Sequence, residues 1–267
     1  MELDAYFRRI GYAGSRTPDL ATLHAICSAH VHAIPFENLD VLLGRGIDLE
    51  LAAIERKLVL GGRGGYCFEQ NTLLLRVLET LGYAVVPISA RVRVGRPRDY
   101  TPARTHVFLR VELAGESWLA DVGVGGLSPT CALRLDSEAE QATPHEPRRI
   151  LREHGRLYHQ VRFGTEWQDI CEFTLEEMPP IDRELGNWYT SAHPQSHFRS
   201  RLVVARARPD RGRVSILNRE LTIRRDGIGE TTLLRSPAEL LAALATHFDL
   251  HFPAGTEFAC PALDWPA

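Results

Sequence analysis

Cys67 stands in the most unusual local context of this chain of 267 residues. It follows the glycine-rich segment 61–66, Gly-Gly-Arg-Gly-Gly-Tyr, and it precedes an apolar pattern with helical spacing. Glycines allow positive φ and close backbone approach, so the run predicts a turn directly before a helix. At the N-terminus of a helix, unpaired N–H groups and the helix dipole favour a thiolate. The alternative interpretation is a glycine cap followed by an inert, buried cysteine.

A histidine and an aspartate further along the chain favour the first interpretation. His106 opens a segment of alternating apolar residues 39 positions after Cys67, and Asp121 follows 15 positions later. A tight turn near Ala114 and Gly115 would make this stretch a hairpin, with the two side chains opposite each other to within a residue or two. Opposed side chains share a face and lie about 5 Å apart at Cβ. Asp121 could then orient one imidazole nitrogen while the other faces the thiolate, so the sequence predicts a catalytic triad.

The elements around these residues follow the order helical, then β, then mixed. Helical spacing marks residues 4–12, 18–32, 49–60 and 73–81. From Tyr83 the period is two, which predicts strands at 85–93, 106–113, 118–124, 157–163 and 168–173. Later strands are expected at 202–207, 214–217 and 221–224, with an amphipathic helix at 237–248. This order predicts an α+β fold whose middle part is a barrel or a strongly curved sheet.

Composition argues against several classes of function. Lysine and arginine number 31 against 34 acidic residues, a net charge of -3, so we expect neither nucleic acid nor a membrane surface as partner. The first residues lack an apolar secretory segment, and no stretch reaches the roughly 18 apolar residues of a membrane span, which favours the cytoplasm. Five scattered cysteines without a Cys-x-x-Cys pair argue against a disulfide framework and a metal site.

Arginines nevertheless gather in two places along the chain. These are Arg91, Arg93, Arg96, Arg98 and Arg104, and then Arg199 and Arg201. Such clusters are usually solvated faces of a protein. The alternative is contact with a negatively charged cosubstrate.

Ordered blocks over nearly the whole sequence resemble the arylamine N-acetyltransferases, most closely those of the enterobacterial type. The hallmark Arg-Gly-Gly-Tyr-Cys-Phe-Glu stands at 63–69, and further matching blocks stand at 35–40, 105–106, 121–123, 143–145, 193–198 and 217–219. The resemblance implies three domains, in agreement with the order of elements above. They are a helical bundle at 1–83 that carries the nucleophile, a β-barrel at 84–186 that carries His106 and Asp121, and an α/β lid at 187–267.

The resemblance also implies a reaction. Cys67 would be the nucleophile, His106 the base and Asp121 the orienting carboxylate. In a ping-pong scheme, acetyl-CoA would be the cosubstrate and an arylamine, arylhydrazine or arylhydroxylamine the acceptor, with no permanently bound cofactor. The oxyanion would be held by the backbone N–H of Cys67 and by one from the loop Pro102, Ala103 and Arg104, which we also expect to contact the cosubstrate.

Phe36, Val124 and Phe198 are the candidate residues of the acceptor pocket. The family usually has phenylalanine at the position of Val124, and valine cannot stack on an aromatic amine. Plain core packing is the alternative role for Phe36 and Phe198. Glu37 and Arg63 have opposite charges in two of the matched blocks, and we predict a structural ion pair that braces the nucleophile loop.

Three other functions fit parts of the same pattern. Ansamycin-type amide synthases of the same family use this triad to close a macrolactam from a polyketide thioester. Papain-like and transglutaminase-like hydrolases also combine cysteine, histidine and asparagine or aspartate, but the sequence shows no sign of secretion. A catalytically inactive binding protein is the third alternative, and the intact triad argues against it. The sequence predicts no oligomeric state.

Overall fold

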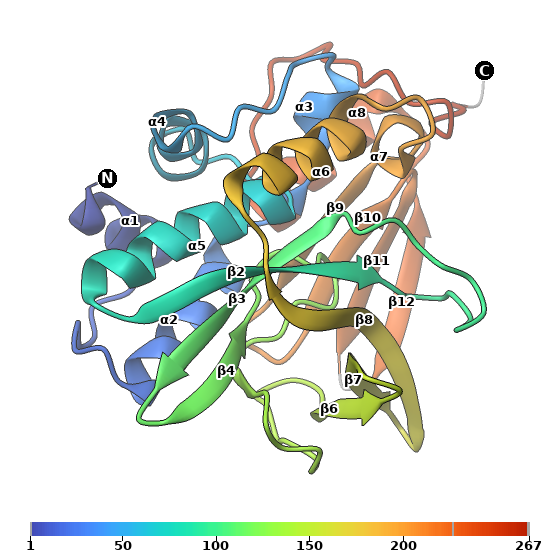
Figure 1. Ribbon diagram of the computed structural model, residues 1–267. Helices are drawn as coiled ribbons and strands as arrows, with labels where there is room; N and C mark the ends of the chain where they lie inside the picture. Colours follow the sequence, from blue (N-terminus) through green and yellow to red (C-terminus); the bar gives the residue numbers. More distant parts are fainter. Residues whose placement is uncertain (1, 226, 266–267) are drawn as a thin grey trace.

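A group of N-terminal helices lies beside a strongly curved sheet, and a second sheet with a helix of its own follows toward the C-terminus (Figure 1). The computed structural model describes residues 2–225 and 227–265. The elements occur in the order helical, β and mixed, so the predicted α+β fold is confirmed. The division into domains at residues 83 and 186 stays a prediction.

The N-terminal helices pack their apolar faces together, apart from the short helix at Leu39–Leu42, whose leucines pack in the core of the second sheet. The helices are α1 (Leu3–Ile10), α2 (Leu20–Ala33), α3 (Leu39–Leu42), α4 (Leu51–Ile54), the π-helical segment η1 (Glu55–Leu60) and α5 (Cys67–Leu81). The helices predicted at 4–12 and 18–32 are confirmed to within two residues. The helix predicted at 49–60 is found from residue 51, and its second half is π-helical. The last of the four begins at Cys67, where the glycine run predicted the start of a helix.

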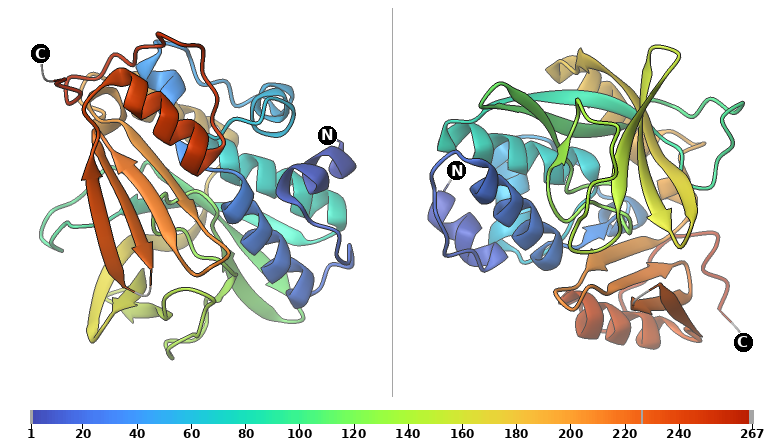
Figure 2. Two further views of the ribbon diagram at one scale, coloured as in Figure 1. Left: turned by 180° about the vertical axis from the view of Figure 1, so that it is seen from behind. Right: turned by 90° about the horizontal axis from the view of Figure 1, so that it is seen from below.

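Seven antiparallel strands form the curved sheet in the middle of the molecule. They are β2 (Ala84–Val92), β3 (His106–Leu113), β4 (Glu116–Ala120), β5 (Leu133–Arg134), β6 (Arg148–Glu153), β7 (Arg156–Phe163) and β8 (Glu166–Glu177), in the order β5-β4-β3-β2-β8-β7-β6. Gln141 links the two edge strands: it forms a β-bridge with Arg148, and its side chain accepts from the N–H of Arg134 at 2.7 Å. The sheet is therefore nearly closed, as the barrel prediction required (Figure 2).

The second sheet joins an N-terminal segment to the C-terminal part of the chain. Its strands are β1 (Phe36–Glu37), β9 (Val203–Ala207), β10 (Arg213–Leu217), β11 (Glu220–Arg225) and β12 (Ile228–Leu233), in that order across the sheet. The predicted helix α8 (Pro237–Phe248) packs on one face of it (Figure 2). Helices α6 (Pro180–Ala192) and α7 (His197–Ser200) connect the two sheets. In the described part of the chain, none of the helices has both the length and the apolar character that a membrane span requires.

One predicted strand ends earlier than its sequence pattern suggested. The pattern indicated a strand at 118–124, but β4 stops at Ala120. The Asp121 carboxylate accepts the N–H of Gly123 at 2.9 Å, which turns the backbone out of the ladder. This turn keeps the Asp121 side chain on the inner face of the sheet while the following residues leave it.

Gly64 makes the closest backbone approach in the nucleophile loop, and its replacement by alanine is expected to destabilise the fold by about 3 kcal/mol. A Cβ there would lie 2.1 Å from the carbonyl oxygen of Pro35. That oxygen also accepts from Gln70 Nε2 at 3.1 Å, so the backbone cannot yield freely. The free energy of unfolding in urea is the measurement. Gly46→Ala, where a Cβ meets nothing within 4 Å, is the control. Equal stability of the two variants would contradict the steric argument.

Candidate active site

Cys67 is the first residue of α5, directly after the glycine-rich turn. At this position its backbone N–H has no partner within the helix, so the N–H is free to donate to a bound group. Its side chain is buried, with 4% of its surface exposed. The turn is held from inside: Glu69 accepts the N–H of Tyr66 at 3.1 Å, and Gln70 Nε2 donates to the carbonyl of Gly65 at 2.6 Å. The glycines and these two side chains together fix the start of α5.

Ion pairs of Arg63 and Lys57 with nearby buried carboxylates also stabilise this turn. Arg63 lies 2.7 Å from Glu37 and 3.1 Å from Asp40, and Glu37 is fully buried. The predicted pair of Glu37 and Arg63 is therefore confirmed. Lys57, from the π-helical segment, lies 2.9 Å from Asp40 and 2.7 Å from Glu69. Burial raises the pKa of Glu69 to about 7, and the attraction of Lys57 opposes that shift.

The hairpin that carries His106 and Asp121 has the register that the sequence predicted. Strands β3 and β4 pair Leu113 with Glu116 across a turn in which Ala114 and Gly115 both have positive φ, 52° and 81°. Two-residue hairpin turns favour this conformation. Extending the register places Asp121 diagonal to His106 by two positions, on the same face of the sheet. His106 Nε2 and Asp121 Oδ2 are 2.7 Å apart.

The electrostatics of this pair favour an imidazolium facing a carboxylate. Burial lowers the pKa of His106, but Asp121 and Cys67 outweigh burial and raise it to about 10. Burial raises the pKa of Asp121, while His106, the N–H of Gly123 and Asn71 lower it by more. The His106 side chain is 2% exposed and the Asp121 side chain 1%, so water screens their attraction little.

Cys67 completes the group on the other side of the imidazole. Its thiol donates to the carbonyl oxygen of Thr105 at 3.6 Å, and its interaction with His106 raises the pKa of that histidine. Since Asp121 occupies Nε2, Nδ1 is the nitrogen left for the sulfur. The backbone of Gly123 lies against Cys67, because a Cβ at Gly123 would stand 2.7 Å from Cys67 Cα. The structure thus brings together the three residues predicted from the sequence, in an arrangement that fits a nucleophile, a base and an orienting carboxylate.

Asn71 is part of this group and was missed in the sequence. Its Nδ2 donates to Asp121 Oδ1 at 3.0 Å and to the carbonyl of Val107 at 2.7 Å, while its Oδ1 accepts the N–H of Val122 at 3.1 Å. It ties α5 to both strands of the hairpin. The available signal was its spacing, since a residue four positions after Cys67 lies on the same face of the helix.

The candidate pocket residues fall into two apolar clusters. Phe36 and Phe198 pack edge to face, with ring centroids 5.9 Å apart, in the cluster that includes Cys67. Val124 is half-buried and packs against the interior of the curved sheet. The two clusters are neighbours. Gly125 follows Val124 directly and lies against Phe36, because a Cβ at Gly125 would contact the Phe36 ring at 3.5 Å.

The candidate cosubstrate loop is anchored but its side chains are exposed. Arg91 donates to the carbonyl of Pro102 at 2.5 Å, and Pro102 is half-buried. Ala103 and Arg104 are exposed, and Arg104 lies 3.5 Å from Glu176. Thr105, whose carbonyl meets the thiol, ends this loop.

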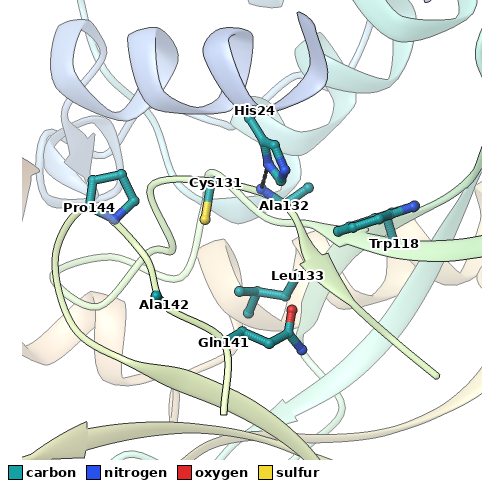
Figure 3. A pocket seen from close by; sticks show the side chains of 8 residues that line it. All are labelled: His24, Trp118, Cys131, Ala132, Leu133, Gln141, Ala142 and Pro144. Atoms are coloured by element: carbon teal, nitrogen blue, oxygen red, sulfur yellow. Dashed lines mark hydrogen bonds between the residues drawn. The ribbon is translucent and has the colours of Figure 1, made fainter. Parts of the chain in front are cut away.

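A separate pocket of about 350 Å³ lies between α2 and the strands β4 and β5 (Figure 3). It is lined by His24, Trp118, Cys131, Ala132, Leu133, Gln141, Ala142 and Pro144, and none of the three residues Cys67, His106 and Asp121 contributes to it. Within residues 2–225 and 227–265, no three His, Cys, Asp or Glu side chains are grouped to hold a metal ion.

Comparison with known proteins places the chain in a family. A sequence model of an N-acetyltransferase family matches residues 19–256. The arylamine N-acetyltransferase of Mycolicibacterium smegmatis is 45% identical over 94% of this chain and 92% of that protein. The Escherichia coli arylamine N-acetyltransferase is 41% identical over 93% of this chain and 88% of its own length. The Mycobacterium marinum enzyme in complex with CoA superposes with a TM-score of 0.89, at 40% identity over 93% of this chain and 92% of that one.

These likenesses agree with the fold and the site geometry. A cysteine, a histidine and an aspartate lie together where the start of a helix packs against a curved sheet. This arrangement is typical of enzymes that use a cysteine as nucleophile. The chain belongs to the arylamine N-acetyltransferase family.

Proposed function

We propose that this protein transfers an acetyl group from acetyl-CoA to an arylamine through an acetyl-cysteine at Cys67. The observation that carries the proposal is the buried contact of His106 with Asp121 at 2.7 Å, directly beside the Cys67 thiol. Relatives named arylamine N-acetyltransferases along nearly the whole chain support the reaction, and a relative bound to CoA supports the donor. Arylhydrazines and arylhydroxylamines are the further acceptors we propose.

In the donor half-reaction, the Cys67 sulfur attacks the thioester carbonyl carbon of acetyl-CoA. A carbon–sulfur bond forms, and the carbonyl π electrons move to oxygen. The backbone N–H of Cys67 is placed to donate to that oxyanion, together with an N–H of the loop at residues 102–104. The intermediate then expels the CoA thiolate, which takes a proton from the His106 imidazolium. Cys67 keeps the acetyl group, and His106 is left neutral.

In the acceptor half-reaction, the arylamine attacks the acetyl-cysteine. An arylamine is a weak base and is neutral at pH 7, so its lone pair is available. Neutral His106 accepts the proton that the nitrogen loses, and Asp121 stabilises the imidazolium that forms. The amide leaves, and Cys67 departs as the thiolate beside that imidazolium. The free enzyme is thereby restored with all protons accounted for.

The intact mass of the protein after incubation with acetyl-CoA, without acceptor, tests the donor half-reaction. We expect the mass of one acetyl group to be added, and peptide mapping to place it on Cys67. Addition of an aniline should remove it and release the acetanilide. No acetylation, or acetylation elsewhere, would contradict the proposal. Release of acetate at the same rate without aniline would instead indicate a hydrolase.

The remaining parts of the proposal concern the setting of the reaction. We propose the cytoplasm as the compartment, acetyl-CoA as a transient cosubstrate rather than a resident cofactor, and small molecules as the only ligands of the site. The loop at Pro102, Ala103 and Arg104 is proposed to contact the donor, and Phe36, Val124 and Phe198 the acceptor.

Val124→Phe is expected to change acceptor preference by about two- to twelvefold. The substitution adds an aromatic contact, worth about 0.5–1.5 kcal/mol, for a small flat amine and removes space that bulky amines use. The variant should therefore gain kcat/KM with small anilines and lose it with multi-ring amines. Acetylation of Cys67 by acetyl-CoA is the control and should not change. An unchanged ratio between one small and one bulky amine would show that residue 124 does not line the pocket.

A further inference from the structure

Two arginines of the β2–β3 loop, residues 93–105, anchor the loop to the curved sheet. Arg93 is buried, donates to Glu172 at 2.6 Å, and binds the carbonyl oxygens of Pro97 and Tyr100 at 2.9 and 3.1 Å. Arg98 pairs with Asp169 at 2.7 Å and with Glu153 at 2.6 Å. These contacts hold the loop in one shape, so the loop is a fixed platform for its remaining side chains.

Arg96 stands on this platform over the Tyr100 ring, 5.2 Å from its centroid, and contacts a histidine rather than an acid. Its guanidinium Nη2 lies 3.4 Å from His197 Nε2. His197 begins α7, and Arg201 follows that helix directly. Burial, Arg201 and Arg96 all lower the pKa of His197. Over residues 2–225 and 227–265, no carboxylate forms an ion pair with Arg96 or with Arg201.

Both segments that carry these groups contact the nucleophile or the apolar cluster around it. The β2–β3 loop ends at Thr105, whose carbonyl accepts from Cys67. Phe198, the residue after His197, packs in the apolar cluster of Cys67. Asn38 Nδ2 fixes α7 by donating to the carbonyls of Phe198 and Arg201, at 2.8 and 2.7 Å. Figure 1 shows this loop projecting at the right of the molecule, below α7.

We propose that Arg96, His197 and Arg201 form the site that binds a phosphate group of the CoA portion of the donor. The proposal rests on the function proposed above and adds residues to it. Guanidinium groups bind phosphate oxygens through paired, charge-assisted hydrogen bonds, and an imidazole N–H adds a third donor. A phosphate there would supply the negative charge that both guanidinium groups lack among the described residues. The phosphate would also link the curved sheet to α7 across the seam between them, because Arg96 belongs to the β2–β3 loop and His197 to α7.

The test compares two acetyl donors in Arg96→Gln, Arg201→Gln and the double variant. Acetyl-CoA carries phosphates, whereas S-acetyl-N-acetylcysteamine offers a thioester without them. For acetylation of Cys67, we expect kcat/KM with acetyl-CoA to fall about tenfold for each arginine removed, mostly through KM. The rate with the short donor should change less than twofold. Arg8→Gln, an exposed arginine of α1 far from this seam, is the charge-matched control and should leave both donors unchanged.

The outcomes separate this site from the reaction itself. An unchanged KM for acetyl-CoA in the double variant, or an equal loss with both donors, would overturn the phosphate site while leaving the acetyl transfer intact. Failure of both donors to acetylate wild-type Cys67 would instead overturn the proposed function. Inorganic pyrophosphate should compete with acetyl-CoA in the wild type and not in the double variant. Its binding at these residues without competition would show a site for free phosphate and would also overturn the assignment.

Discussion

Replacing Cys67 by alanine is expected to lower acetyl transfer about a thousandfold or more while leaving the fold intact. The sulfur forms the bond to the acetyl group. Among the described residues, the other side chain that bonds to Asp121 is the amide of Asn71, which is no nucleophile. The loss of one buried sulfur atom removes little apolar volume. We therefore expect the free energy of unfolding to change by about 1 kcal/mol or less.

The measurement is the rate of acetanilide formation with acetyl-CoA and an aniline, together with a urea unfolding curve. Cys27→Ala is the matched control, because it removes the same atom from a buried position among the N-terminal helices. That variant should keep its activity. Residual activity of Cys67→Ala above a few per cent of wild type would refute the assignment of the nucleophile, since contaminating or uncatalysed transfer would not reach that level.

The geometry of the site could be predicted because it depends on short-range patterns. A glycine run before a helix fixes where Cys67 stands, and the hairpin turn at Ala114 and Gly115 fixes which face His106 and Asp121 share. Both signals act within a few residues of the groups that they position. The role of Asn71 was not predicted, because it depends on contacts with residues of the hairpin that lie 36 and 50 positions further along the chain.

Strands β1 and β12 and helix α6 were not predicted, for a related reason. Strand β1 pairs with β9 through Phe36 and Ala205, and a two-residue strand carries too little periodicity to be recognised. Strand β12 is exposed along its whole length, so it has no alternation of buried and exposed residues. In α6, Ile181, Leu185 and Trp188 are exposed, and its buried face contains Gly186, which packs against Phe68. These elements form through contacts with residues distant in the sequence, which local sequence patterns do not reveal.

Asp121→Asn is expected to lower kcat/KM about 10³- to 10⁴-fold with little change in structure. The carboxylate contributes the largest of the attractions that raise the pKa of His106 to about 10 against the effect of burial. Without it, burial prevails and the pKa of His106 falls, so the imidazole becomes neutral at pH 7. An amide could also donate to Nε2, and the proton would then lie on Nδ1 facing the sulfur. The thiolate would lose its counter-ion in either case.

Alkylation of Cys67 by iodoacetamide, followed from pH 5 to 10, separates this electrostatic role from a structural one. The raised pKa of His106 keeps the imidazolium present until the pH rises through about 10, so the wild-type thiol should react rapidly throughout the neutral range. In Asp121→Asn the rate at pH 7 should fall, and it should recover as rising pH ionises the sulfur without help from His106. Asp136→Asn, an exposed carboxylate paired with Arg134, is the control and should follow the wild-type profile. Since a merely misfolded variant would expose the thiol and alkylate faster, a slower rate at pH 7 with full recovery at pH 10 identifies the loss of the ion pair. Wild-type and variant profiles that coincide would contradict the proposed role of Asp121.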